Sequence, residues 1–97
     1  MPKLVDNRAD ADEIYRKVLD AARKATKYVA HTDLSFHDGV WIITIETDIP
    51  HGVGDLAETI IKKSKRGMHA RSKAFPGQFD WASDTYIKDQ VLISFRF

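Results

Sequence analysis

Apolar residues recur at three- and four-residue spacing between residues 10 and 30, which predicts an amphipathic helix over this range. Asp10 and Glu13 have the Asp-x-x-Glu spacing of a capping box, so we expect the helix to begin at Asp10. We expect its apolar stripe to face the core, and the stripe consists of Ile14, Val18, Ala21, Ala22, Ala25 and Val29.

Residues 31–48 alternate between apolar and polar on both sides of Asp38-Gly39, a pair that tolerates the positive φ angles of a two-residue hairpin turn. This turn places His37 opposite Val40 and puts the largest apolar pairs on one face of the sheet. The same register pairs Phe36 with Trp41, Leu34 with Ile43 and Thr32 with Ile45.

A second helix is predicted after Pro50 and a turn at Gly52-x-Gly54, and Gly67 is a plausible residue to end it. Its expected inward stripe consists of Val53, Leu56, Ala57, Ile60 and Ile61.

Two further strands follow from the alternation in residues 68–75 and from about Tyr86 to Phe97. The first strand is expected to turn small residues toward the helices. The second is apolar on one face, and Asp89 near its start interrupts this apolar pattern. Pro76-Gly77 opens a loop that we expect to continue to residue 86.

These elements occur in the order helix, strand, strand, helix, strand, strand. An α+β two-layer sandwich buries all the apolar faces, with both helices on one face of a four-stranded, mainly antiparallel sheet. Residues 1–97 suit a single domain of this kind, and we expect residues 1–9 to be flexible. Double-stranded-RNA-binding domains, K-homology domains and phage tail-terminator proteins share parts of this order, but we find no motif of theirs in the chain.

Charge adds the strongest functional signal. The chain has 15 Lys/Arg and 14 Asp/Glu, yet residues 62–73 contain six of the Lys/Arg and no acid, so the remainder carries a net charge of −5. Such segregation predicts one face that binds an anionic partner, either nucleic acid or an acidic protein surface. The candidate anion-binding residues are Lys62, Lys63, Lys65, Arg66, His69, Arg71, Lys73 and Arg96.

These candidates fall into two groups. Lys62, Lys63, Lys65 and Arg66 lie at the predicted end of the second helix, where cations also stabilise the helix dipole, so part of this cluster has a structural explanation. The others are expected on the open face of the sheet, beside Lys88 and Gln90. Phe79 and Trp81 in the adjoining loop are candidates for stacking on unpaired bases.

No catalytic fingerprint occurs in the chain. It has no cysteine, which excludes disulfides and thiolate metal sites, and its four histidines lack metal-ligand spacing. His51-Gly52-Val53-Gly54 is too short a pattern for a phosphate loop. We therefore expect no metal, no cofactor and no enzyme activity, although a site shared between subunits would be invisible in one chain.

Two hypotheses remain for the function. The first is a small DNA- or RNA-binding domain with weak sequence specificity, which contacts phosphates through the basic helix end and sheet face. The alternative is a protein-interaction module. It would be either an oligomeric structural subunit or an inhibitor of a larger complex, for example one that handles nucleic acid. The short chain would suit a viral protein of this kind. Val40, Ile42 and Leu92 on the open face would then anchor the contact. Without a spanning apolar segment or a signal-peptide core, we expect a cytoplasmic protein and no membrane partner.

Overall fold

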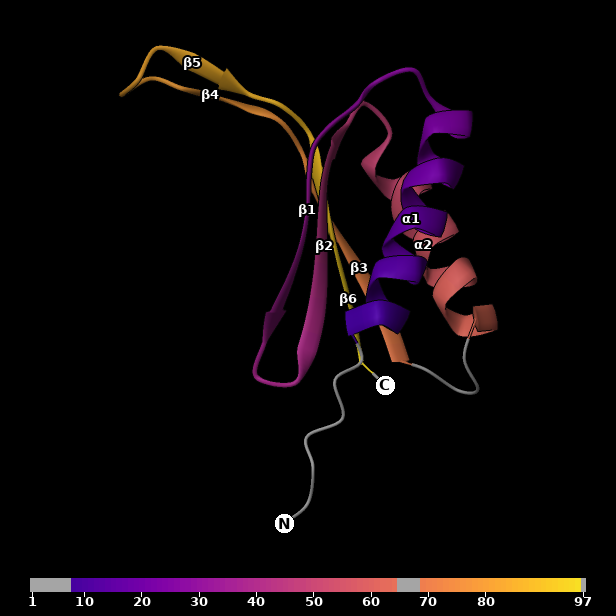
Figure 1. Ribbon diagram of the computed structural model, residues 1–97. Coiled ribbons are helices and arrows are strands. Elements are labelled where there is room, and N and C mark those ends of the chain that lie inside the picture. The colour runs from indigo at the N-terminus through magenta and orange to yellow at the C-terminus, as the bar shows by residue number, and fades with distance from the viewer. Residues whose placement is uncertain (1–7, 65–68, 97) are drawn as a thin grey trace.

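Two helices pack against one face of a four-stranded antiparallel sheet, as predicted (Figure 1). The computed structural model describes residues 8–64 and 69–96. The sheet has the strand order β1-β2-β6-β3, and a separate two-stranded sheet pairs β4 with β5. The elements are α1 (Arg8–Ala25), β1 (Val29–His37), β2 (Val40–Thr47), α2 (Pro50–Ser64), β3 (His69–Phe75), β4 (Gln78–Asp80), β5 (Thr85–Ile87) and β6 (Gln90–Arg96).

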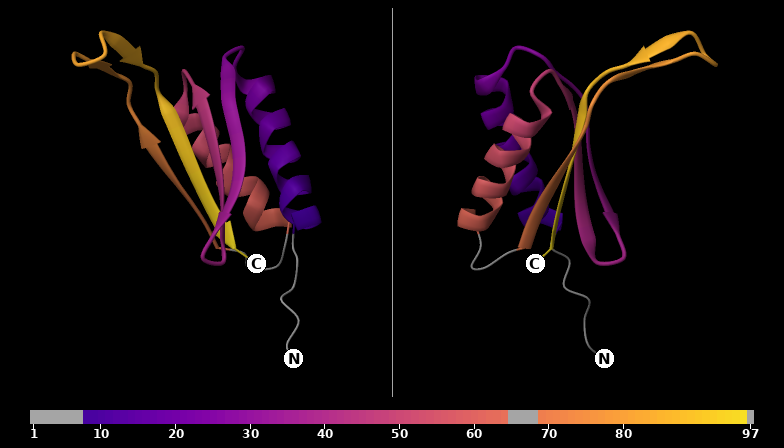
Figure 2. Two further views of the ribbon diagram at one scale, coloured as in Figure 1. Left: turned by 60° about the vertical axis from the view of Figure 1, so that its left-hand side comes forward. Right: turned by 180° about the vertical axis from the view of Figure 1, so that it is seen from behind.

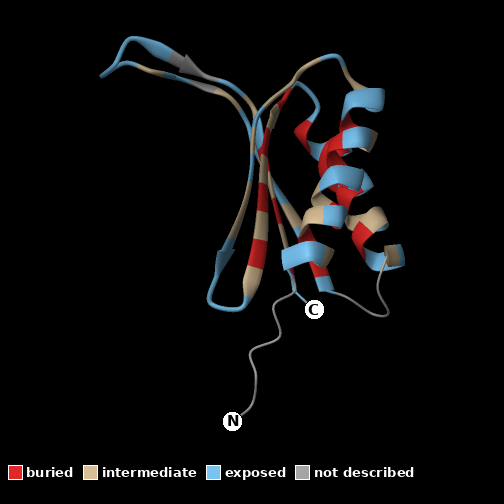
Figure 3. Ribbon diagram, in the orientation of Figure 1, coloured by how far each residue is buried: buried red, intermediate tan, exposed pale blue. Residues whose placement is uncertain are grey.

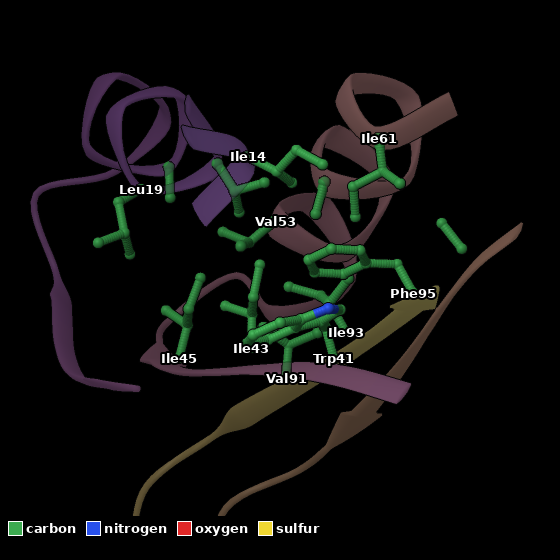
Figure 4. Close-up of a cluster of buried hydrophobic side chains, with 14 of the residues drawn as sticks. Ile14, Leu19, Trp41, Ile43, Ile45, Val53, Ile61, Val91, Ile93 and Phe95 are labelled. Atoms are coloured by element: carbon green, nitrogen blue, oxygen red, sulfur yellow. The ribbon is translucent and has the colours of Figure 1, made fainter. Parts of the chain in front are cut away.

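The core lies between the two layers and draws most heavily on the central strands. Alternate residues of β2 and β6 are buried toward the helices, whereas the residues between them are only half-buried on the free face (Figure 3). Figure 4 shows how these side chains meet those of α1 and α2. The predicted inward stripe is wrong at Leu56, which is 38% exposed on α2. The core residues from the central strands β2 and β6 are Trp41, Ile43, Ile45, Val91, Ile93 and Phe95, and β3 adds Ala70.

The β1–β2 hairpin confirms the predicted turn, because Asp38 and Gly39 have φ angles of 51° and 80°. The structure confirms the pairs His37–Val40, Phe36–Trp41 and Leu34–Ile43. The pairing of Thr32 with Ile45 is wrong. A bulge places His31 and Thr32 between the pairs Ala30–Glu46 and Asp33–Thr44, and His31 has a φ of 48°.

Both ends of α1 differ from the prediction. The helix begins at Arg8, so Asp10 lies in its first turn and is not the capping residue. It ends at Ala25, because the Thr26 hydroxyl accepts a hydrogen bond from the backbone N–H of Tyr28 at 3.2 Å and redirects the chain. Val29 therefore belongs to β1, where it pairs with Thr47 instead of continuing the helical stripe.

Helix α2 begins at Pro50, so the two glycines lie inside its first turns and not in a preceding turn. Proline suits the first position of a helix because its φ is already helical. Gly54 is buried where α2 meets β3, and a Cβ atom there would lie 2.7 Å from the Ser72 hydroxyl. The predicted end at Gly67 lies outside the described residues.

Residues 76–89, which we call the arm, depart most from the prediction. Instead of a loop, β4 and β5 form a hairpin that prolongs β3 and β6 beyond the edge of the core. Figures 1 and 2 show that the arm leans away from the helices, toward the side of the free sheet face. The last strand breaks at Lys88 and Asp89, where the sequence indicated an irregularity.

Candidate functional site

The free face of the sheet carries a strip of basic side chains along one edge. His69, Arg71 and Lys73 alternate with the inward-facing small residues of β3, and all three are exposed. Strand pairing sets Arg96 of β6 directly beside His69. The structure thus brings together the four sheet residues that the sequence predicted, and we call them the basic strip.

Charges in the basic strip are arranged differently from those on α1. The acids of α1 form ion pairs one turn along the helix, as in Asp12–Arg16 at 2.9 Å and Glu13–Lys17 at 3.3 Å. Within the described part of the chain, Arg71, Lys73 and Arg96 form no ion pair. The basic strip therefore has positive charge available for an anionic partner.

The helix-end cations do not join the basic strip. Lys62 and Lys63 lie in the last turn of α2, on the face of the sheet opposite to the strip, and Lys62 pairs with Glu58 at 3.6 Å. Lys65 and Arg66 lie outside the described residues. Among the described candidates, the single predicted cationic site is thus divided between two faces of the molecule.

One end of the basic strip is hollowed. An open depression of about 400 Å³ lies where β3 begins and β6 ends, next to the β1–β2 turn. We call this depression the seat, and its lining combines three basic residues with apolar and small ones. It is lined by Val40, His69, Arg71, Ser94, Phe95 and Arg96.

Three apolar side chains lie on the otherwise polar free face, at the positions that the sequence predicted. Val40, Ile42 and Leu92 are half-buried there, in rows that run from β1 across to the basic strip. One row joins Asp33, Thr44, Leu92 and Lys73 through consecutive strand pairs. The face therefore has a polar side on β1 with one acid, Asp33, three apolar side chains nearer its centre and a basic side on β3.

The arm tip, residues 79–84, presents the two predicted stacking residues away from the basic strip. Trp81 is 85% exposed and Phe79 is 39% exposed. Their ring centroids lie 4.5 Å apart with an interplanar angle of 65°, an edge-to-face arrangement that orders both rings. The pattern of apolar residues did not predict this hairpin, although residues that favour turns lie between the two short strands.

Hydrogen bonds within the arm tip hold its turn. The Asp80 carboxylate accepts the backbone N–H of Ala82 at 3.0 Å and the hydroxyl of Ser83 at 2.8 Å. These bonds, led by the one from Ser83, lower the pKa of Asp80, so its carboxyl stays ionised. With Asp84, the tip carries two acids and no Lys or Arg.

Asp89 both closes the neck of the arm and joins it to β2. Its carboxylate accepts a hydrogen bond from the backbone N–H of Gly77, and its carbonyl accepts the N–H of Thr47 at 3.0 Å. The Lys88 ammonium lies 4.6 Å from the ring centroid of Tyr28, which adds a cation–π contact. These contacts set the direction in which the arm projects.

A polar cluster beside the neck surrounds Glu46. The Tyr28 hydroxyl donates a hydrogen bond to its carboxylate, and His31 Nδ1 lies 2.9 Å from the same oxygen. The bond from Tyr28, followed by that with His31, lowers the pKa of Glu46, while the same carboxylate raises the pKa of Tyr28. This cluster ties the β1 bulge to β2.

The described residues contain no group of three His, Asp or Glu side chains placed to hold a metal ion. Within the same residues, neither helix combines the length and apolar character needed to cross a bilayer.

Comparison with protein-family models, with curated proteins and with solved structures finds no match. The function of this site is accordingly inferred from its geometry and charge.

Proposed function

We propose that the protein is an interaction module that forms an oligomer through its arm and the free face of its sheet. The observation that carries this proposal is the 85% exposure of Trp81 at the end of an arm that is fastened at its neck. Tryptophan is enriched among the residues that dominate protein interfaces, because its large ring loses much water contact on binding.

The free face supports the same function. Val40, Ile42 and Leu92 form an apolar centre with polar residues of β1, Asp33 among them, on one side and the basic strip on the other. An apolar core with a charged rim is the usual composition of a protein–protein contact surface. The helices leave this face uncovered in the single chain (Figure 1).

Sedimentation equilibrium of the purified protein tests the proposal directly. We expect an assembly larger than the monomer, and we expect Ile42→Asp with Leu92→Asp to shift it toward monomers. Leu56→Asp is the control, since Leu56 is an apolar residue that is exposed on α2, outside the proposed contact. A wild-type protein that stays monomeric at about 100 μM would remove the proposal.

Nucleic-acid binding is a second candidate, and it is favoured by the cations of the basic strip that form no ion pair with another described residue. Arg71, Lys73 and Arg96 could each neutralise a phosphate, and exposed Phe79 and Trp81 could stack on unpaired bases. Weak sequence specificity would follow, because contacts to phosphates do not read base identity.

Fluorescence anisotropy of labelled single- and double-stranded DNA and RNA, titrated at several salt concentrations, tests this candidate. Binding by the basic strip would weaken steeply with salt and fall sharply in Arg71→Glu with Lys73→Glu. The control is Arg23→Glu with Lys27→Glu, which makes the same charge change at the end of α1 and just after it. This control should reduce nucleic-acid binding far less. An absence of binding at low salt would exclude nucleic acid as the partner.

A further inference from the structure

We propose that the arm tip of one copy of this chain binds the seat on the free sheet face of a second copy. This inference rests on the proposed oligomer-forming function and identifies both the contact and the partner. The arm tip comprises residues 79–84, and the seat is the depression between the start of β3 and the end of β6.

Charge complementarity carries the inference. The arm tip holds Asp80 and Asp84 and no basic residue, whereas the seat is lined by His69, Arg71 and Arg96 and no acidic residue. Opposite charges at the rim of a contact speed its formation and discriminate against wrong partners. Both surfaces belong to the same chain, so the acidic arm tip of a second copy can supply the negative charge that the seat would bind.

The apolar parts of the two surfaces also match. Trp81 and Phe79 form one compact aromatic pair at the tip, and Val40, which is half-buried on the free face, contributes apolar lining to the seat. The seat volume of about 400 Å³ lies within the range of about 300–1,000 Å³ found for pockets that hold small organic groups. An arginine of the seat can additionally stack on the face of an inserted indole ring.

The arm cannot occupy the seat of its own chain. The seat lies at the end of the sheet where β3 starts, while the arm leaves from the other end of the same strand (Figure 1). Seven extended residues separate these ends by roughly 20 Å. Because the Asp89 contacts hold the neck, the arm also projects away from its own sheet end. The complementary surfaces can therefore meet only between two molecules.

A larger hollow fits the arm tip less well. It has a volume of about 560 Å³ and lies at the neck, where its lining includes Asp48 and Asp89. Two carboxylates there would repel Asp80 and Asp84 of an incoming tip. Charge thus selects the seat over this more apolar hollow.

The lean of the arm indicates how two copies would be arranged. The arm bends toward the side of the free face (Figure 2). If the free faces of two copies meet with their strands pointing in opposite directions, the arm of one copy reaches the end of the other sheet that bears the seat. The same arrangement returns the second arm to the first seat. A twofold axis relates the two contacts, and the assembly closes as a dimer.

A charge-swap experiment with full-length chains tests the contact. One variant has a basic tip, made by Ala82→Lys with Asp84→Lys, which leaves the Asp80 bonds of the turn in place. The second variant has an acidic seat, made by Arg71→Glu with Arg96→Glu. We expect each variant alone to be monomeric, and an equimolar mixture to form a mixed dimer, because both of its contacts again join opposite charges. Sedimentation velocity measures all three samples.

Each outcome bears on a different claim. A monomeric wild type would overturn the assembly itself, and with it this contact. A wild-type oligomer that persists in both variants would leave the proposed function standing but overturn the contact between tip and seat. Monomeric variants that fail to recover on mixing would also overturn the contact, provided that circular dichroism shows both variants to be folded.

A third variant separates the aromatic from the charged part of the contact. Trp81→Ala keeps the tip charge, and we expect it to raise the dissociation constant at least about 30-fold, as for a central interface tryptophan. A dissociation constant unchanged by Trp81→Ala would overturn the insertion of the ring. If the wild type binds nucleic acid and stays monomeric, and only the acidic-seat variant loses that binding, the seat takes a phosphate backbone instead.

Discussion

The Glu58 carboxylate on α2 accepts two hydrogen bonds from Ser72 on β3, one from its backbone N–H at 3.1 Å and one from its hydroxyl at 2.5 Å. β3 is an edge strand of the sheet, so this N–H would otherwise be available to a further strand. Glu58 therefore both joins the helix to the sheet and blocks part of an exposed edge.

Removing this carboxylate should destabilise the fold. We expect Glu58→Ala to lower the free energy of unfolding by about 1–3 kcal/mol, because the Ser72 N–H loses its acceptor. Glu13→Ala is the control, since Glu13 makes an exposed ion pair with Lys17 and should cost less than about 0.5 kcal/mol. Urea unfolding at neutral pH measures both, and equal effects would refute the edge role of Glu58.

The same contact should make stability depend on pH. The Ser72 hydroxyl, as the largest cause, lowers the pKa of Glu58 in the folded protein below its ordinary value. Its contribution to stability is therefore complete above the ordinary pKa and is lost as the pH falls through the lowered folded value. In Ser72→Ala we expect the pKa of Glu58 to rise toward normal and that contribution to shrink. Carbon-13 NMR titration of the carboxyl checks the pKa, and an unchanged value would contradict this account.

Two glycines of α2 should respond to alanine with opposite signs. A Cβ at Gly54 would lie 2.7 Å from the hydroxyl and 2.9 Å from the Cβ of Ser72, so Gly54→Ala should destabilise the fold by about 1–3 kcal/mol. A Cβ at Gly52 would meet only Ile49, at 3.6 Å, so Gly52→Ala should stabilise the helix by about 0.5–1 kcal/mol. Thermal unfolding of both variants decides this, and stabilisation by Gly54→Ala would show that the helix can shift outward.

Asp89 should control how firmly the arm is held. In Asp89→Ala, the Gly77 N–H loses its carboxylate acceptor, and we expect the neck to weaken by about 1–3 kcal/mol. Hydrogen exchange of the arm amides should accelerate, while exchange of the β2 and β6 amides in the core stays nearly unchanged. Asp33→Ala removes an exposed acid from β1 and should leave the arm unaffected. Unchanged arm exchange in Asp89→Ala would show that other contacts set its direction.

Local patterns in the sequence predicted much of the fold. Asp38-Gly39 determined the hairpin register, because the turn and the alternation of apolar residues specify the same pairing from Leu34 to Ile43. The order of elements followed from the periodicity of apolar positions, since each face must be covered by another element. The basic strip also followed from alternation along β3, because side chains two residues apart share a face.

Other features needed contacts between residues far apart in the chain. Val29 lies in β1 and not in the predicted helix because it pairs with Thr47. The bulge at His31 and Thr32 shifts the β1–β2 pairing at the end of the hairpin far from the Asp38-Gly39 turn, so the turn could not predict it. Gly54 is explained only by Ser72 on another element, and the arm only by the fastening of Asp89 to Gly77 and Thr47.

The candidate site shows the same division. Charge segregation in the sequence predicted an anionic partner, but only the tertiary structure separated Lys62 and Lys63 from the basic strip and carried Trp81 to the end of an arm. By itself, the sequence determined which residues alternate, turn and carry charge, because those properties depend on neighbours within a few positions. The tertiary structure decided which charges share a face and what projects from it, because those relations depend on how the layers pack.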